Sequence, residues 1–133
     1  MIGTAQLRCV FAFLLALTCA SCNRDLPRSR FVGTYEAQHE KGMETLTLDS
    51  DGSYKHHFKG ELGMDVTSAG SWEVARVGSK QRLVVHDLTP HFPGRPDAAS
   101  NYLLEPHEDY GLLRLYVSRQ PRQFYLELEQ KRK

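Results

Sequence analysis

Apolar and polar residues alternate along most of the chain after residue 30. In the stretch 44–58, ETLTLDSDGSYKHHF, leucine first alternates with threonine, and Tyr54, His56 and Phe58 then alternate with lysine and histidine. A period of two places successive side chains on opposite faces of a strand. The turn-forming run Asp49 to Gly52 lies between the two halves and therefore predicts a hairpin with one apolar and one hydrated face.

An isolated hairpin is only marginally stable in water, so further strands must cover its apolar face. The same alternation recurs along the rest of the chain, with polar turns between the runs and no helical period. Eight strands are predicted, around residues 31–35, 44–48, 54–59, 70–75, 83–88, 101–105, 112–118 and 124–129. This pattern predicts an all-β fold, a single antiparallel up-and-down meander that forms a small barrel or half-barrel.

Two short segments repeat the same residue types. Gly33-Thr34-Tyr35-Glu36-Ala37 corresponds to Gly70-Ser71-Trp72-Glu73-Val74, and an alternating strand follows each. In both segments a glycine lies two positions before a large aromatic residue on the same face, which lets that aromatic ring or a neighbouring backbone pack across the gap. The repeat predicts two strand-turn-strand units; the alternative is coincidence among short β motifs.

The first 21 residues have the features of a secretory signal peptide. They contain one basic residue, Arg8, and no acidic one, and an apolar run, CVFAFLLALTCA, precedes small residues. The run is shorter than the roughly 20 residues that a membrane-spanning helix needs. We therefore expect residues 1–21 to be removed as a signal peptide.

The end of this segment, Cys19-Ala20-Ser21-Cys22, resembles the lipobox of bacterial lipoproteins. The resemblance implies that Cys22 is lipidated and becomes the first residue of the mature protein, held on a membrane by its acyl chains. Because Asn23 follows rather than aspartate, the resemblance favours the outer membrane, with the protein facing the periplasm. The alternative is ordinary cleavage after Ala20 or Ser21, which leaves Cys22 unmodified.

The mature chain divides into a lipidated cysteine and tether (22–30), a β domain (31–129) and a basic tail (130–133). No cysteine follows Cys22, so the domain has no disulfide and depends on a packed core. Loss of Arg8 with the signal peptide leaves equal numbers of basic and acidic side chains, a balance that argues against a nucleic-acid partner. The basic residues of the tether and tail are expected to be solvated ends, with contact to anionic headgroups or lipopolysaccharide phosphates as the alternative.

Three motifs of the β domain resemble lipocalins. Gly33-Thr34-Tyr35 is similar to the Gly-x-Trp signature of that family, with Tyr in place of Trp; the hairpin around Asp51-Gly52 and Gly70-Ser71-Trp72 are similar to small bacterial relatives. The resemblance spans residues 31–129 and implies a barrel whose interior holds side chains or one small apolar ligand. The predicted ligand contacts are the inward-facing Tyr35, Tyr54, Phe58 and Trp72, with Phe92 and Arg95 from the long loop 89–100. The alternative is that the inward residues form a plain core.

Neither a catalytic site nor a metal site is predicted. His56 and His57 are adjacent on a strand, so their rings point to opposite faces and cannot bind one ion together. The other histidines are scattered, and the domain offers no cysteine to complete a tetrahedral site. No serine occupies the strand-to-helix elbow of a hydrolase. We therefore expect surface histidines, no cofactor and no enzyme activity.

The last two predicted strands carry apolar residues on both faces. One face can enter the core, and the other presents Tyr116 and Tyr125 as a predicted partner patch. The sequence thus predicts a membrane-anchored envelope lipoprotein that binds a small apolar ligand. The alternatives are an envelope protein-interaction or assembly module with a filled barrel core, and a metal-handling lipoprotein.

Overall fold

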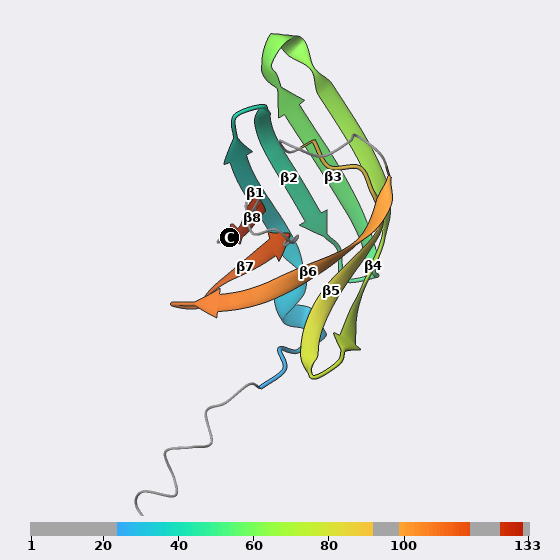
Figure 1. Cartoon of the computed structure of the whole chain (residues 1–133), viewed down its shortest axis with the longest axis vertical. Coiled ribbons are helices and arrows are strands. Elements are labelled where there is room, and N and C mark those ends of the chain that lie inside the picture. The colour runs from blue at the N-terminus through green and yellow to red at the C-terminus, as the bar shows by residue number, and fades with distance from the viewer. Residues whose placement is uncertain (1–23, 92–98, 118–125, 132–133) are drawn as a thin grey trace, which may run out of the picture.

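The computed structural model describes residues 24–91, 99–117 and 126–131. Within these ranges the chain forms two short 3-10 helices and eight strands (Figure 1). The helices are η1 (Arg28–Phe31) and η2 (Glu61–Gly63). The strands are β1 (Gly33–His39), β2 (Gly42–Leu48), β3 (Ser53–Gly60), β4 (Asp65–Val77), β5 (Lys80–Leu88), β6 (Ser100–Asp109), β7 (Leu112–Val117) and β8 (Leu126–Gln130). No helix in these ranges is long and apolar enough to cross a membrane.

The strands form a closed antiparallel barrel in sequence order. Each strand pairs with the next, and β8 pairs back with β1, where Tyr35 lies opposite Gln130 and Glu36 lies opposite Glu129. Closure removes the exposed sheet edges that an open meander would leave. The predicted all-β meander of eight strands is confirmed, and it forms a barrel rather than a half-barrel.

The hairpin predicted in residues 44–58 is formed by β2 and β3. The amide of Gly52 donates a hydrogen bond to the carbonyl of Asp49 at 3.1 Å. The Asp51 carboxylate accepts hydrogen bonds from the amide and the hydroxyl of Ser53, at 2.8 and 2.6 Å. Gly52 has a φ of +92°, a conformation that glycine adopts with little strain. The turn residues and the alternation in the flanking strands therefore both favour the β2–β3 hairpin.

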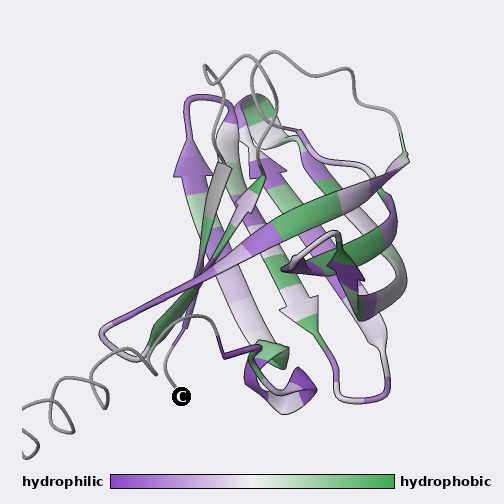
Figure 2. Cartoon of the chain, turned by 60° about the horizontal axis from the view of Figure 1, so that its bottom comes forward, coloured by the Kyte–Doolittle hydropathy of each residue, from purple (hydrophilic) through white to green (hydrophobic). Residues whose placement is uncertain are grey.

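Every second residue of the strands points into the barrel. Figure 2 shows hydrophilic and hydrophobic residues alternating along them. The buried apolar core consists of Phe31, Tyr35, Ala37, Leu46, Leu48, Tyr54, Trp72, Leu83, Val85, Leu88, Tyr102, Leu104, Leu113, Leu115, Val117 and Leu128. Packing of these side chains is what stabilises the described domain, since it contains no cysteine.

Several strand boundaries differ from the prediction, most clearly those of β1, β4 and β6, which ends at Asp109. β4 begins earlier because its residues 65–71 pair with β3, whereas residues 72–77 pair with β5. Phe31, predicted in the first strand, belongs to η1 instead. Its carbonyl accepts a hydrogen bond from the Tyr35 hydroxyl at 2.7 Å, which holds this helical turn against the end of the barrel.

The second glycine of the repeat makes room for a ring. Gly70 lies opposite Tyr54, whose hydroxyl donates a hydrogen bond to the His86 carbonyl at 2.9 Å. A Cβ atom on Gly70 would lie 2.7 Å from Cε1 of Tyr54 and 2.9 Å from the His86 carbonyl oxygen. The Tyr54 ring of the neighbouring strand therefore packs across the position where a side chain is missing, whereas the sequence predicted the Trp72 ring or a backbone segment there.

Gly70→Ala should lower the free energy of unfolding by about 1–3 kcal/mol, because the added methyl group forces the ring or the β5 backbone to shift. Urea denaturation measures the change. Ser71→Ala is the control, since Ser71 is the exposed neighbour on the opposite face and should change stability by less than about 0.5 kcal/mol. Equal stabilities of the two variants would contradict this packing.

Residues 24–32 pack across one end of the barrel, which we call the proximal end; it carries the β2–β3, β4–β5 and β6–β7 turns. The backbone of Leu26 exchanges two hydrogen bonds with the side-chain amide of Gln81, at 2.9 and 2.8 Å. Arg28 donates to a carbonyl of the β2–β3 turn at 3.1 Å, and its guanidinium lies 4.7 Å from the centre of the Trp72 ring. This contact is a cation–π interaction.

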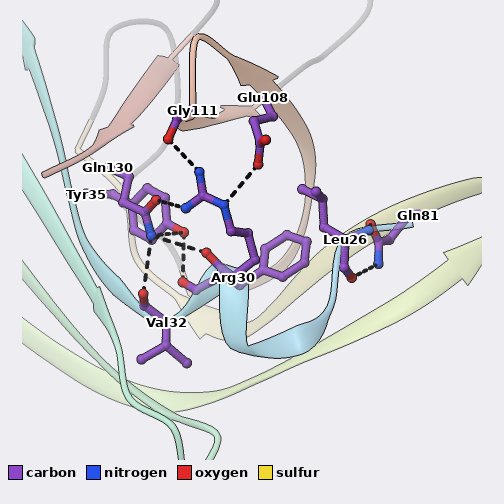
Figure 3. Close-up of polar contacts among 9 residues, drawn as sticks. Leu26, Arg30, Val32, Tyr35, Gln81, Glu108, Gly111 and Gln130 are labelled. Atoms are coloured by element: carbon purple, nitrogen blue, oxygen red, sulfur yellow. Dashed lines mark hydrogen bonds and ion pairs between the residues drawn. The ribbon is translucent and has the colours of Figure 1, made fainter. Parts of the chain in front are cut away.

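Arg30 joins the same segment to the remaining elements of the proximal end (Figure 3). Its guanidinium contacts Glu108 at 2.9 Å, the Gly111 carbonyl at 2.6 Å and the Gln130 side chain at 2.7 Å. Residues 25–30, which the sequence suggested as a tether, are thus packed against all three turns and the end of β8. The opposite, distal end carries the β1–β2 connection, η2 and the chain that follows β5.

Candidate functional site

An acidic side chain is buried in the distal half of the barrel. Glu44 shares the inward face of β2 with Leu46 and Leu48, and only 1% of its surface is exposed. A carboxylate removed from water is costly unless charged or hydrogen-bonding groups surround it. The groups around the Glu44 carboxylate therefore determine the chemistry of this end of the barrel.

Three histidines from separate segments approach the Glu44 carboxylate. His56 of β3 forms a buried hydrogen bond from Nε2 to Oε2. His39 of β1 places Nε2 at 3.4 Å from Oε1. The backbone amide of His91, which follows β5, donates to Oε1 at 2.7 Å. Both carboxylate oxygens are thus engaged, and the carboxylate fixes the start of the chain after β5.

Aromatic and hydroxyl groups complete this arrangement. The Phe58 ring stacks against His91 with 4.7 Å between centroids and against His39 with 5.8 Å. On the other side of the pair, Nδ1 of His56 lies 3.2 Å from the Ser68 hydroxyl. We call these six residues the distal cluster: His39, Glu44, His56, Phe58, Ser68 and His91.

The prediction of surface histidines is wrong for the distal cluster. His56 is 3% exposed and His91 is 7% exposed, and the His39 side chain is 10% exposed. The physical reason is that the Glu44 carboxylate inside the barrel gives the His56 and His39 rings a polar partner in place of water, whereas the His91 ring stacks against Phe58. In the sequence, alternation places Glu44 and His56 on the apolar faces of two paired strands, β2 and β3. This pattern is the signal that could have indicated the contact between Glu44 and His56.

The prediction that the His56 and His57 rings point to opposite faces of their strand is confirmed. His56 points inward, whereas His57 points outward and places Nε2 at 2.6 Å from the Asp65 carboxylate. Across the described ranges, no group of three or more His, Cys, Asp or Glu side chains has an arrangement that could hold a metal ion.

The predicted ligand contacts are divided between the two halves of the barrel. Tyr35, Tyr54 and Trp72 lie in the buried core, and each donates its polar hydrogen to a backbone carbonyl, at 2.7, 2.9 and 3.0 Å respectively. Phe58 alone lies in the distal cluster. Phe92 and Arg95, together with the predicted lipidation site Cys22, lie outside the described residues.

The predicted partner patch is described only in part. Tyr116 is half-buried on the outer face of β7, where its ring meets His107 edge to face at 6.0 Å between centroids. Tyr125 lies outside the described residues.

The described residues line a small cavity and a larger hollow. A cavity of about 10 Å³ adjoins the distal cluster and is lined by Glu44, Leu46, His56, Leu88, Pro90, Val117 and Leu128. This volume corresponds to roughly one water molecule. A hollow of about 520 Å³, which includes Arg30, Thr34, Thr47 and Lys131, lies at the proximal end. An apolar ligand in the small cavity would therefore have to displace side chains.

Buried tyrosines give the fold a defined response to alkaline pH. Burial raises the pKa of Tyr35 well above its ordinary value of 10.0, against the opposing effect of the Arg30 charge. Burial also raises the pKa of Tyr54, and the Asp87 carboxylate adds to this effect. Above about pH 10 the unfolded chain releases protons that the folded barrel keeps. Stability is therefore complete below this pH and falls as the pH rises.

Tyr35→Phe should flatten this alkaline loss. The variant loses the hydrogen bond to Phe31, at a cost of about 0.5–1.5 kcal/mol at neutral pH, but it no longer carries the phenol that the unfolded state ionises. Thermal denaturation at about pH 8 and about pH 11 measures both effects. If the melting temperature falls equally between these two pH values in the wild type and in Tyr35→Phe, Tyr35 is not the source of the alkaline loss.

No family model, no curated protein and no solved structure matches this chain. Its function is therefore inferred from the chemistry of its own residues.

Proposed function

We propose that the chain is a lipid-anchored protein of the bacterial cell envelope that acts by binding a small ligand at the distal end of its barrel. The anchor is supported by the signal-peptide features of residues 1–21 and by the lipobox resemblance at Cys22. Asn23 after this cysteine supports an outer-membrane position facing the periplasm.

The distal cluster is the observation that carries the binding proposal. Ligand sites are typically apolar cavities with a few converging polar groups, and Ser68, His56 and the Phe58 ring provide both kinds of surface. A buried carboxylate–imidazole pair gives a barrel no stability that apolar side chains of equal volume could not give. Its presence therefore favours recognition of a small, mainly apolar molecule with one hydrogen-bonding group.

Native mass spectrometry of the protein extracted from its own membrane tests the ligand. We expect a retained small molecule on the wild type and on Tyr54→Phe, the control in the proximal core. The same mass should be missing from His56→Gln, which loses the imidazole but keeps an amide. Absence of any retained mass from the wild type, or its retention by His56→Gln, would contradict the proposal. A retained metal mass would support metal handling instead.

Cys22→Ser tests the anchor. Without the thiol no acyl chain can be attached, so the variant should move from the membrane fraction to the soluble fraction of the envelope. Ser21→Ala keeps a small residue before the cysteine and is the matched control. Soluble wild-type protein would contradict lipid anchoring.

The packed core of the described residues favours a second candidate, an envelope protein-interaction or assembly module. On this proposal Tyr116→Glu or Tyr125→Glu removes a partner from affinity purification and leaves the melting temperature unchanged. Unchanged recovery of the partner would count against this function.

A further inference from the structure

The N-terminal segment leaves little free chain between the proposed acyl group and the barrel. Asp25 forms an ion pair with Arg76, and the backbone of Leu26 is fixed to Gln81. From Cys22 to Asp25 three residues at ~3.3 Å each span at most about 10 Å. If Cys22 is lipidated, as proposed above, the proximal end is held within this distance of the bilayer.

The surface of the proximal end suits contact with lipid headgroups. Tyr110, in the β6–β7 turn, is 93% exposed, and Val77, at the end of β4, is 49% exposed. Tyrosine is enriched where membrane meets water because its ring is apolar and its hydroxyl is polar. Arg24 and Lys80 are exposed at the same end. Acidic groups here are partly neutralised, since Asp25 pairs with Arg76 and Glu108 pairs with Arg30.

The backbone of the β6–β7 turn is unusual for a tyrosine. Tyr110 has a φ of +49° and the following Gly111 has a φ of +75°. Two positive φ values in succession favour Asn-Gly or Gly-Gly, and a bulky residue at the first position is strained. Leu62 at the distal end combines a positive φ with full exposure in the same way, so the choice between the two ends rests on the short, packed N-terminal segment.

We infer that the barrel stands on the membrane with its proximal end against anionic headgroups, Tyr110 and Val77 lying at headgroup level. The inference rests on the proposed lipid anchor. The distal cluster then faces away from the bilayer, toward the periplasm. An N-terminal segment that is packed against the barrel fixes this orientation, whereas a free tether would allow the domain to rotate.

Quenching of a single fluorescent label by spin-labelled lipids tests this orientation in the full, acylated protein. The chain after Cys22 contains no cysteine, so Tyr110→Cys and Leu62→Cys each provide one labelling site. Leu62 is the matched control because it is fully exposed, has a φ of +57° and lies in η2 at the distal end. Each labelled protein is placed in phosphatidylethanolamine–phosphatidylglycerol vesicles that contain lipids spin-labelled in the headgroup.

The label at position 110 should be quenched several-fold more strongly than the label at position 62. Equal quenching of both labels, or stronger quenching at position 62, would overturn the orientation. The intact mass of the same samples separates the two proposals. An unacylated start overturns the lipid anchor and with it the inference, whereas an acylated protein with equal quenching overturns the inference alone.

Discussion

Glu44→Ala is expected to lower the free energy of unfolding by about 3–5 kcal/mol, because it leaves buried polar groups without their hydrogen-bond acceptor and removes a buried side chain. The substitution leaves the His91 amide without its acceptor and removes the carboxylate from His56 and His39. It also creates a cavity beside the existing one. Urea denaturation followed by far-ultraviolet circular dichroism measures the loss.

Two variants separate the effect of burial from the effect of charge. Glu44→Gln keeps the shape and the acceptor oxygen, so its loss should be smaller than that of Glu44→Ala. Glu36→Ala removes a carboxylate that pairs with Lys131 at the surface, and its effect should be within about 1 kcal/mol. If Glu44→Ala is no more destabilising than Glu36→Ala, the carboxylate does not organise the distal cluster.

Phe31→Ala should cost about 3–5 kcal/mol, as expected for a large aromatic ring removed from a core. The Phe31 side chain is fully buried although it precedes β1, because η1 places it inside the proximal end. Thermal and urea denaturation measure the change.

The control for Phe31→Ala is Val77→Ala, which shortens a half-exposed apolar residue at the same end and should change stability by less than about 1 kcal/mol. Similar small losses for both variants would show that residues 24–32 are a free tether and not part of the packed domain. The orientation on the membrane would then lose its structural basis.

Most of the fold follows from local patterns. Alternation identified the β2–β3 hairpin because its turn residues and its inward face lie within a few positions of each other. Closure of the barrel could not be predicted in this way. It depends on the register between β1 and β8, where Glu36 meets Glu129 at opposite ends of the domain sequence. No local period reports such a pairing, so the barrel and the half-barrel were equally consistent with the sequence.

The distal cluster was predicted only in part, for a related reason. The inward position of Phe58 was predicted from alternation, whereas His56 on the same face was predicted to be a surface histidine and is buried. Whether an inward histidine finds a partner depends on neighbouring strands and on the chain after β5, which together bring His39, Glu44 and His91 around it. The packing of Arg30 against the proximal end was missed similarly, because an arginine in a polar segment is also typical of a solvated tether.

A crystal structure of the protein purified from its own membrane is the most direct test of the central claim, that the distal cluster is a recognition site. We predict non-protein electron density in contact with the Ser68 hydroxyl, the His56 imidazole and the Phe58 ring. A distal end that is filled by the chain's own side chains, with water as the only other density near Glu44, would contradict it.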